Sequence, residues 1–266
     1  MCIIVVMKKL FRKIVFITLL FIGIFSVSYF YKNSLNNSIN LTPGVLGLPD
    51  TKDNFEIEVN FNNEIYKVNW YEINNTDNLL LLVNQNRQTS QAFMDQNKCI
   101  FLSSGGYYKT DYSPTGLLIS EYSEVSHFVY SILANGIFSI NDFATPRITS
   151  QVPRDRLRFA LQAGPLLKEN GEFINLSLRN DEEARRVVLG VTGENKAIFM
   201  IVYKPDSALF GPYLKDLTKI IEEFEIKTGI IFADAMNLDG GSPTVFKNED
   251  INLTESTMVG NFFCLR

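Results

Sequence analysis

Short apolar runs of strand length, separated by turn residues, recur from residue 55 to the end of the chain. Residues 55–61 (FEIEVNF) and 64–70 (EIYKVNW) alternate with period two around Asn62-Asn63, which predicts a β-hairpin. Further runs of strand length lie at residues 79–83, 99–102, 116–119, 136–140 and 197–203. So many strands beside few helical segments predict an α+β (mixed α/β) fold: one strand-rich domain with a mixed sheet and a few flanking helices.

Two segments have the pattern of helices. One covers residues 89–97, and the other begins after Gly211-Pro212 and stops at Gly229. The second has one apolar face, formed by Leu214, Leu217, Ile220, Ile221 and Phe224. The chain contains neither a G-x-G-x-x-G nor a P-loop motif, so we expect no nucleotide cofactor.

The N-terminal segment has the organisation of an export signal. Four cations in MKKLFRK precede an uncharged apolar run at residues 14–30, and a polar stretch follows. That order predicts a signal peptide or signal anchor over residues 1–31, with the membrane as a partner and the rest of the chain exported, to the periplasm or outside the cell. As a helix the run is about 25 Å long, near the lower limit for spanning a bilayer. The pattern fits a cleaved signal and a retained anchor equally.

The remainder of the chain is acidic. Residues 32–54 are rich in Asn, Ser, Pro and Asp and are predicted to be a polar tether, and residues 55–266 are predicted to form one domain. Residues 1–32 hold five of the 25 cations and none of the 29 acids, which leaves a net charge of -9 for the rest. An acidic body repels phosphate backbones, so nucleic acid is not expected as a partner.

The histidine and cysteine content excludes several kinds of metal site. One His and three Cys are too few for a Cys-rich zinc site, a multi-histidine cage or an iron–sulfur cluster. His127 has no G-x-S-x-G nucleophile motif to accompany it, so we expect a structural or surface role. In an exported domain, Cys99 and Cys264 either form one disulfide or remain two buried thiols.

The strongest local signal is the sequence NLDGGS at residues 237–242. A strand that ends in Asp-Gly-Gly places a carboxylate and two unobstructed backbone amides at the rim of a sheet. Asp239 can then act as a general base, a nucleophile or a metal ligand, and the amides of Gly240 and Gly241 can face one anion. The alternative is a simple hairpin turn, since Asp-Gly is a favoured turn pair.

Three weaker stretches accompany it. Gln162, before the Gly164-Pro165 kink, either points into a cleft or caps backbone groups. Arg185-Arg186 enters a predicted strand, where a guanidinium either binds an anion in a bidentate manner or forms a surface ion pair. The loop SSGGYY at residues 103–108 either lines a sugar-sized site or packs its tyrosines on the sheet.

The order of these stretches resembles the phosphodiester glycosidase family. The resemblance runs from about residue 79 to residue 266: SSGGYY and PTGLLI, then LANGIF, ALQAGPLL with NGEF, RRVVLGV, a helix and finally AMNLDGGSPT. It departs from the family pattern at Ser104, where an Asn is usual. It implies catalytic roles for Asp239, Asn237 and Arg186. It also implies the following substrate-binding residues: Gly105, Gly106, Gln162, Gly164, Gly240, Gly241 and Ser242.

The resemblance implies a hydrolase that cleaves a sugar-1-phosphodiester bond in exported or cell-surface glycans. The ligand would be a carbohydrate or glycosyl phosphate, with Asp239 as base or nucleophile. Arg186 and the two glycine amides would hold the phosphate, which leaves readily once its charge is stabilised.

Two alternatives to this hydrolase remain. One is a non-catalytic exported module that binds polysaccharide in the same pocket. The other is metal-dependent hydrolysis. We expect no cofactor, so this alternative requires Asp111, Asp234 and Asp239 to gather around a hard cation such as calcium.

Overall fold

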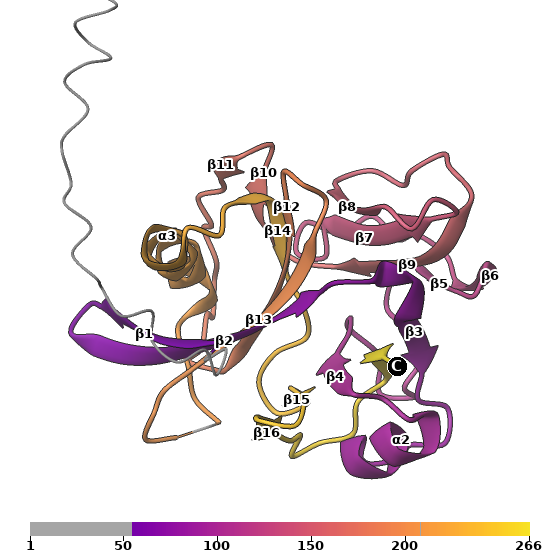
Figure 1. Ribbon diagram of the computed structural model, residues 1–266, viewed down its shortest axis with the longest axis horizontal. Coiled ribbons are helices and arrows are strands. Elements are labelled where there is room, and N and C mark those ends of the chain that lie inside the picture. Colours follow the sequence, from indigo (N-terminus) through magenta and orange to yellow (C-terminus); the bar gives the residue numbers. More distant parts are fainter. Residues whose placement is uncertain (1–54, 208) are drawn as a thin grey trace, which may run out of the picture. The chain divides into compact units, whose positions relative to one another are not determined.

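The computed structural model describes residues 55–207 and 209–266 as three antiparallel β-sheets with two α-helices (Figure 1). The predicted signal segment (1–31) and tether (32–54) lie outside the described residues. Over the described ranges, no helix is long and apolar enough to cross a membrane.

The seven-stranded sheet has the order β1-β2-β13-β12-β14-β10-β11. Its strands are β1 (Glu56–Phe61), β2 (Glu64–Ile73), β13 (Ala197–Tyr203), β12 (Arg186–Thr192), β14 (Phe232–Asn237), β10 (Leu166–Glu169) and β11 (Glu172–Phe173). Of the two five-stranded sheets, one is ordered β16-β15-β4-β17-β3 and the other β6-β5-β9-β7-β8. The first contains β16 (Asn252–Leu253), β15 (Phe246–Lys247), β4 (Phe101–Ser104), β17 (Asn261–Leu265) and β3 (Leu79–Val83). The second contains β6 (Ser123–Ser126), β5 (Leu118–Ser120), β9 (Leu157–Ala163), β7 (Gly136–Asn141) and β8 (Pro146–Thr149).

The expected mixed sheet is wrong, because every strand pair in the described residues is antiparallel. Parallel neighbours require a long crossover, usually helical. Two helical crossovers occur in the described residues: α2 (Ser90–Asn97) joins β3 to β4, and α3 (Leu217–Thr228) joins β13 to β14. In each case the two strands run in the same direction, but a third strand, β17 or β12, lies between them and pairs antiparallel with both.

Local sequence chemistry accounts for several elements. The predicted hairpin is confirmed, and Asn62 and Asn63 both adopt positive φ at its turn. The predicted helices are confirmed as α2 (Ser90–Asn97), which the Thr89 side chain caps, and α3, which ends at Gly229 with φ +73°. Two short 3-10 helices, η1 (Thr76–Asn78) and η2 (Leu214–Asp216), complete the helical elements of these ranges.

Two predicted strands begin two residues later than expected. β4 starts at Phe101 because the N–H of Cys99 still donates to a carbonyl of α2. β5 starts at Leu118 because the Leu117 N–H donates to the side chain of Gln162 instead of to a strand.

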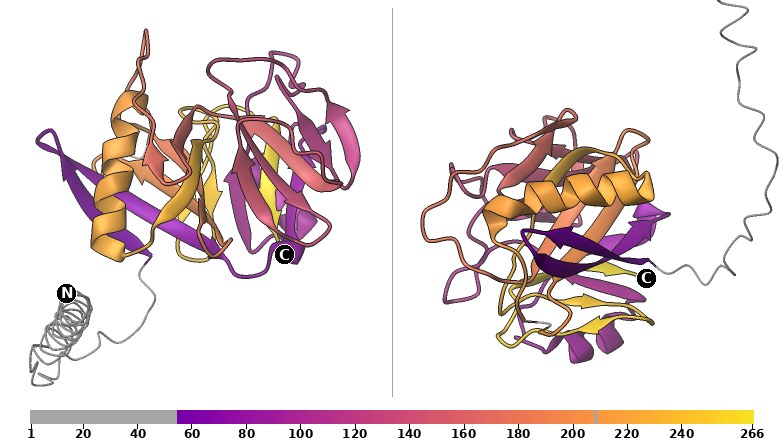
Figure 2. Two further views of the ribbon diagram at one scale, coloured as in Figure 1. Left: turned by 90° about the horizontal axis from the view of Figure 1, so that it is seen from above. Right: turned by 90° about the vertical axis from the view of Figure 1, so that its left-hand side faces the viewer.

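Strand β13 explains why AIFMIVY is apolar without alternation. Ala197, Phe199 and Ile201 face a core shared by all three sheets. The alternate residues Ile198, Met200 and Val202 face a second core beneath α3. This helix lies along one face of the seven-stranded sheet (Figure 2). A strand buried on both faces has no polar side to expose.

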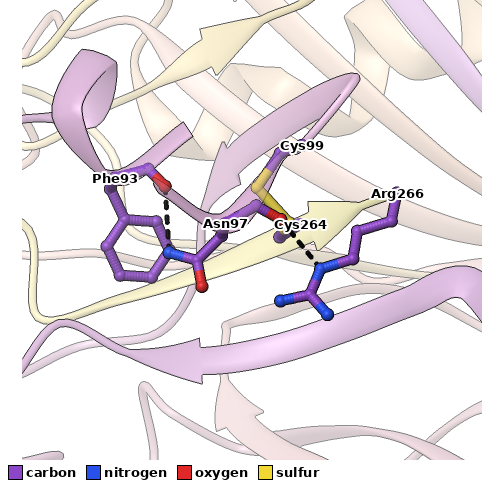
Figure 3. Close-up of a disulfide and its surroundings, with 5 residues drawn as sticks. All are labelled: Phe93, Asn97, Cys99, Cys264 and Arg266. Carbon is purple, nitrogen blue, oxygen red and sulfur yellow. Dashed lines mark hydrogen bonds between the residues drawn. A yellow bond between two sulfur atoms is a disulfide. The ribbon is translucent and has the colours of Figure 1, made fainter. Parts of the chain in front are cut away.

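Cys99 and Cys264 form a disulfide, which decides between the two alternatives left by the sequence (Figure 3). The bridge links the end of α2 to β17 across 165 residues of sequence, with the Cα atoms 5.4 Å apart. Nearby, the Nε of Arg266 donates to the carbonyl of Asn97 at 2.8 Å, so the C-terminus is also attached to α2.

Candidate active site

Asp239 lies just after β14 and is buried, with 9% of its surface exposed. Burial raises the pKa of its carboxyl to about 7, and a hydrogen bond from the Gly240 N–H lowers it only partly. Its backbone is fixed on both sides: its N–H donates to the Gly105 carbonyl at 2.9 Å, and its carbonyl accepts from the Ser104 hydroxyl at 3.2 Å. A carboxyl with this pKa exchanges protons readily near neutral pH.

Asn237 ends β14 and faces the same region. Its Nδ2 donates to the Gly164 carbonyl at 3.1 Å and to the Tyr107 hydroxyl at 3.3 Å. Its Oδ1 is buried and has no hydrogen-bond partner among the described residues. Tyr107 also donates to the Gly164 carbonyl, and burial together with the Asp239 charge raises the pKa of its hydroxyl to about 12. A buried amide oxygen without a donor is suited to a ligand hydroxyl.

Arg186 is the first residue of β12, the strand beside β14. Its Nε donates to the Pro212 carbonyl at 3.2 Å, and its Nη2 donates to the Glu182 carbonyl and lies 3.5 Å from Asp181. Burial lowers the pKa of the guanidinium, and Asp181 opposes that change. The other terminal nitrogen, Nη1, lies beside Gly240. One donor group of the fork is therefore left for a ligand.

A cleft of about 660 Å³ opens beside Arg186. It is lined by residues 178–184, 209–210 and 240–243, together with Leu133, Arg186, Leu214 and Ser256. These residues come from loops that follow different strands, so the cleft lies where the loops meet at the end of β14. Its volume suits a sugar or a small phosphodiester.

The two glycine amides do not form the predicted anion site. The Gly241 N–H donates to the Arg185 carbonyl at 3.0 Å, and the Gly240 N–H is directed to the Asp239 carboxylate. Both donors are already used inside the protein. Gly240, Gly241 and Ser242 nevertheless line the cleft, as their predicted proximity to substrate requires.

Gln162 is a capping residue, the second of its two predicted alternatives. Its Oε1 accepts from the N–H groups of Leu117 and Val129, and its Nε2 donates to the carbonyls of Val129 and Ala134. The side chain is 3% exposed and its hydrogen bonds all go to backbone. The predicted direct contact between Gln162 and a sugar is therefore replaced by support of the loop at residues 129–134.

Gly105, Gly106 and Gly164 support the site from behind. The Gly106 N–H donates to Oδ1 of Asn261 at 2.8 Å, and a Cβ on Gly105 would lie 2.1 Å from the same oxygen. These two glycines let the chain pass close to Asn261 and carry the carbonyl that holds Asp239. Gly164, at φ +149°, offers its carbonyl to Tyr107 and Asn237.

Arg185 and Arg186 have different tasks, although they are adjacent. The Arg185 Nη2 donates to the carbonyl of Thr244 at 2.6 Å and to that of Thr254, so this arginine holds the loop that follows Asp239. Alternation along a strand sends neighbouring side chains to opposite faces. Of these two arginines, only Arg186 lines the cleft.

Asp111, Asp234 and Asp239, the alternative cation ligands, do not lie together. Asp111 binds Ser113 in its own loop, and Asp234 accepts from the Asn170 N–H. Within the described ranges, no three His, Cys, Asp or Glu side chains are grouped to hold a metal. His127 is an exposed residue paired with Glu124.

Sequence reasoning missed the residues that orient Arg186. Asp181 accepts from the N–H groups of Leu214 and Lys215 and also faces the Arg186 guanidinium. Arg179 adds a second cation to the cleft. Both lie in a polar stretch with no motif, so only the adjacent Arg185-Arg186 signal pointed to this part of the chain.

Fold and site together define a class of protein: an antiparallel β domain with a guanidinium in a cleft and a buried, proton-exchanging carboxylate directly before the glycines that line it. The family model for phosphodiester glycosidase matches residues 97–264, more than half of the chain. The chain therefore belongs to the phosphodiester glycosidase family. No curated protein matches it in sequence.

Solved structures share the fold. One is the catalytic domain of zebrafish N-acetylglucosamine-1-phosphodiester alpha-N-acetylglucosaminidase, auto-inhibited by its pro-peptide, with a TM-score of 0.60 and 16% identity over 80% of this chain and 81% of that one. Another is a hypothetical protein from Synechocystis, with a TM-score of 0.55 and 13% identity over 79% of this chain and 61% of that one. At these identities the likeness concerns the fold alone.

Proposed function

We propose that the protein hydrolyses the bond between the anomeric carbon of a sugar and the phosphate of a phosphodiester. The observation that carries this proposal is the buried Asp239 carboxyl, with a pKa of about 7, directly before Gly240, which lines a cleft together with Arg186. Membership of the family and the activity named for the zebrafish relative support the same reaction, with N-acetylglucosamine as the first sugar to try.

Asp239 is assigned the proton-transfer role. In its ionised form it takes a proton from water as the water oxygen bonds to the anomeric carbon. The bond from that carbon to the phosphate oxygen breaks, and both electrons leave with the phosphate. The products are a free sugar and a phosphate monoester.

Arg186 is assigned to the departing phosphate. Its Nη1 faces the cleft beside Gly240 while its other nitrogens are fixed by protein oxygens. A pre-oriented guanidinium stabilises developing phosphate charge without rearranging. Ser242 lines the cleft and is assigned to a sugar hydroxyl. Asn237 does not line the cleft and is assigned to position the Tyr107 hydroxyl and the Gly164 carbonyl, to which its Nδ2 donates.

The location proposed for this reaction is outside the cytoplasm. The disulfide between Cys99 and Cys264 supports export, since such bonds persist in oxidising compartments. Residues 1–31 would direct the chain across the membrane or hold it there, residues 32–54 would act as the tether, and residues 55–266 would be the catalytic domain. Protease treatment of intact cells that express the full chain tests this: digestion of the domain supports export, and protection contradicts it.

The activity is tested with methyl phosphodiesters of N-acetylglucosamine, glucose, galactose and mannose, each linked at the anomeric carbon. Released sugar is measured for the full chain and for Asp239→Asn, Arg186→Lys and Asp234→Asn. The last variant is the matched control, because Asp234 lies on β14 but contacts Asn170, away from the cleft.

We expect Asp239→Asn to lower kcat by at least about a hundredfold, the usual contribution of a positioned acid or base. Arg186→Lys should raise KM or lower kcat, since a lysine keeps the charge but loses the fork. Full activity in Asp239→Asn would remove Asp239 from the mechanism. Sugar binding by a folded protein that cleaves none of the four diesters would favour the polysaccharide-binding module.

A further inference from the structure

Several apolar side chains line the cleft beside its polar and charged residues. Leu133, Leu209 and Phe210 line it with 44%, 53% and 52% of their surfaces exposed. Leu178 lines it from a fourth position. Large apolar side chains that share one exposed hollow with a cation are unusual for a surface that meets only water.

The apolar surface extends from Leu133 along its own loop, residues 128–133 (FVYSIL). Tyr130 and Ile132 are each 85% exposed, and Val129 is 50% exposed. An apolar group that covers this loop removes apolar surface from water. Its binding is then stabilised by about 25 cal/mol per Å² of the surface removed.

This loop is held in place from inside. Gln162 bonds to both backbone groups of Val129 and to the carbonyl of Ala134, and the Ala134 N–H donates to the Ser131 hydroxyl at 2.9 Å. The backbone that presents Tyr130 and Ile132 is therefore fixed before any ligand arrives. A ligand then loses little affinity to ordering the loop.

The cleft thus combines Arg186 and Gly240 with the apolar side chains of Leu133, Leu209 and Phe210. Leu209 lies beside the arginines, since its carbonyl accepts from the Arg185 N–H at 3.3 Å. A diester phosphate held by Arg186 with its sugar toward Asp239 therefore has apolar walls within reach of its second substituent, the alcohol side.

We propose that the substrate is a glycosyl phosphodiester of a long apolar alcohol, that is, a lipid-linked sugar phosphate whose hydrocarbon chain lies against Leu133, Leu209 and Phe210. This inference rests on the proposed function and adds the class of the alcohol. The chain bound here belongs to the substrate itself and not to a membrane surface. Gln162 acts as a positioning residue, because it fixes the loop that carries Leu133.

The test compares methyl, butyl and octyl diesters of N-acetylglucosamine 1-phosphate, all below their micelle concentrations, with the full chain. Each methylene that becomes buried should lower KM about fourfold. We expect octyl to exceed methyl in kcat/KM by about a hundredfold, which corresponds to three or four buried methylenes. Equal kcat/KM for the three diesters would overturn the proposal and leave the hydrolase intact.

The walls are tested with the double variant Leu133→Ser/Phe210→Ser. It should lose most of the preference for octyl, measured as the ratio of kcat/KM for the octyl and methyl diesters, so that a general change in activity cancels. The control is Phe143→Ser, which removes a phenylalanine that is 87% exposed at a turn outside the cleft. Retention of the full octyl preference in the double variant would overturn the proposal.

Binding measurements keep the inference separate from catalysis. If no diester is hydrolysed, calorimetry with the octyl and methyl diesters still compares their Kd values: tighter octyl binding supports the apolar site, and equal binding refutes it. A membrane-contact role for the surface predicts a third result. The double variant would then lose adsorption to phosphatidylglycerol vesicles while octyl and methyl bind equally, which overturns the proposal.

Discussion

Asp239 lowers the stability of the folded domain at neutral pH, and replacing it by Asn should raise that stability. Its carboxyl has a pKa of about 7 when folded and 3.8 as the ordinary value. The unfolded chain therefore releases the proton at lower pH than the folded one. As pH rises from about 4 to about 7, the free energy of unfolding falls, and above 7 the loss is complete. Three pH units correspond to an upper limit of about 4 kcal/mol.

Asn has nearly the shape of a protonated Asp and does not ionise, so Asp239→Asn removes this loss. The measurement is urea unfolding of wild type and variant, as the full chain with its disulfide intact, from pH 4.5 to 8.5. The difference in unfolding free energy should grow by about 1.4 kcal/mol per pH unit between pH 5 and 6.5 and level off above about pH 7.5.

Asp234→Asn controls for the general effect of exchanging Asp for Asn, since Asp234 is partly exposed on β14, the strand that precedes Asp239. A stability gain in Asp239→Asn that does not vary with pH would refute the argument from burial. So would a variant that is less stable than the wild type at pH 8.

Two further predictions concern structural contacts remote from the cleft. Exchanging both Cys99 and Cys264 for Ser should lower the free energy of unfolding by about 3 to 5 kcal/mol, because the bridge closes a loop of 165 residues, and urea unfolding would show it. Lys168→Met leaves the buried Glu225 carboxylate without the ammonium that lies 2.8 Å away, so thermal unfolding should show a loss of about 3 to 5 kcal/mol. The added change Glu225→Gln should restore part of it, because the amide is uncharged and its oxygen still accepts from the Phe232 N–H.

Features set by neighbouring residues were predictable from the sequence. The hairpin at Asn62-Asn63 and the helix end at Gly229 depend on residues that adopt positive φ readily, and both appear where expected. The Asp239 signal had the same origin: a polar residue before two glycines, directly after an apolar strand. Its raised pKa could not be predicted, because it comes from burial, which depends on residues far away in the sequence; Tyr107 and Tyr108, whose pKa values the Asp239 charge raises, lie more than a hundred residues earlier in the chain.

Features set by distant partners were not predictable. Gln162 had two plausible roles, and the choice depended on whether backbone groups at Leu117 and Val129 lay within its reach. The two glycine amides were expected to be open. They are not, because β12 runs alongside this loop and brings the Arg185 carbonyl to Gly241. The sequence shows which donors exist, whereas tertiary structure decides which of them are already used.

The Arg186 guanidinium and the Asp239 carboxylate do not pair with each other, and the cause of this separation can be tested. The Arg186 guanidinium is directed to Asp181, Glu182 and Pro212, and within the described residues no cation lies close enough to lower the Asp239 pKa. A direct ion pair would keep Asp239 ionised and occupy the phosphate donor, so it would disable both groups.

Asp181→Asn removes the charge that holds Arg186 away from Asp239. The Asp239 pKa should then fall, and the acid limb of kcat/KM for the methyl diester should move below pH 7 while Asp234→Asn leaves it in place. An acid limb that does not move in Asp181→Asn would show that backbone carbonyls alone position the guanidinium, and that the separation of charges does not depend on Asp181.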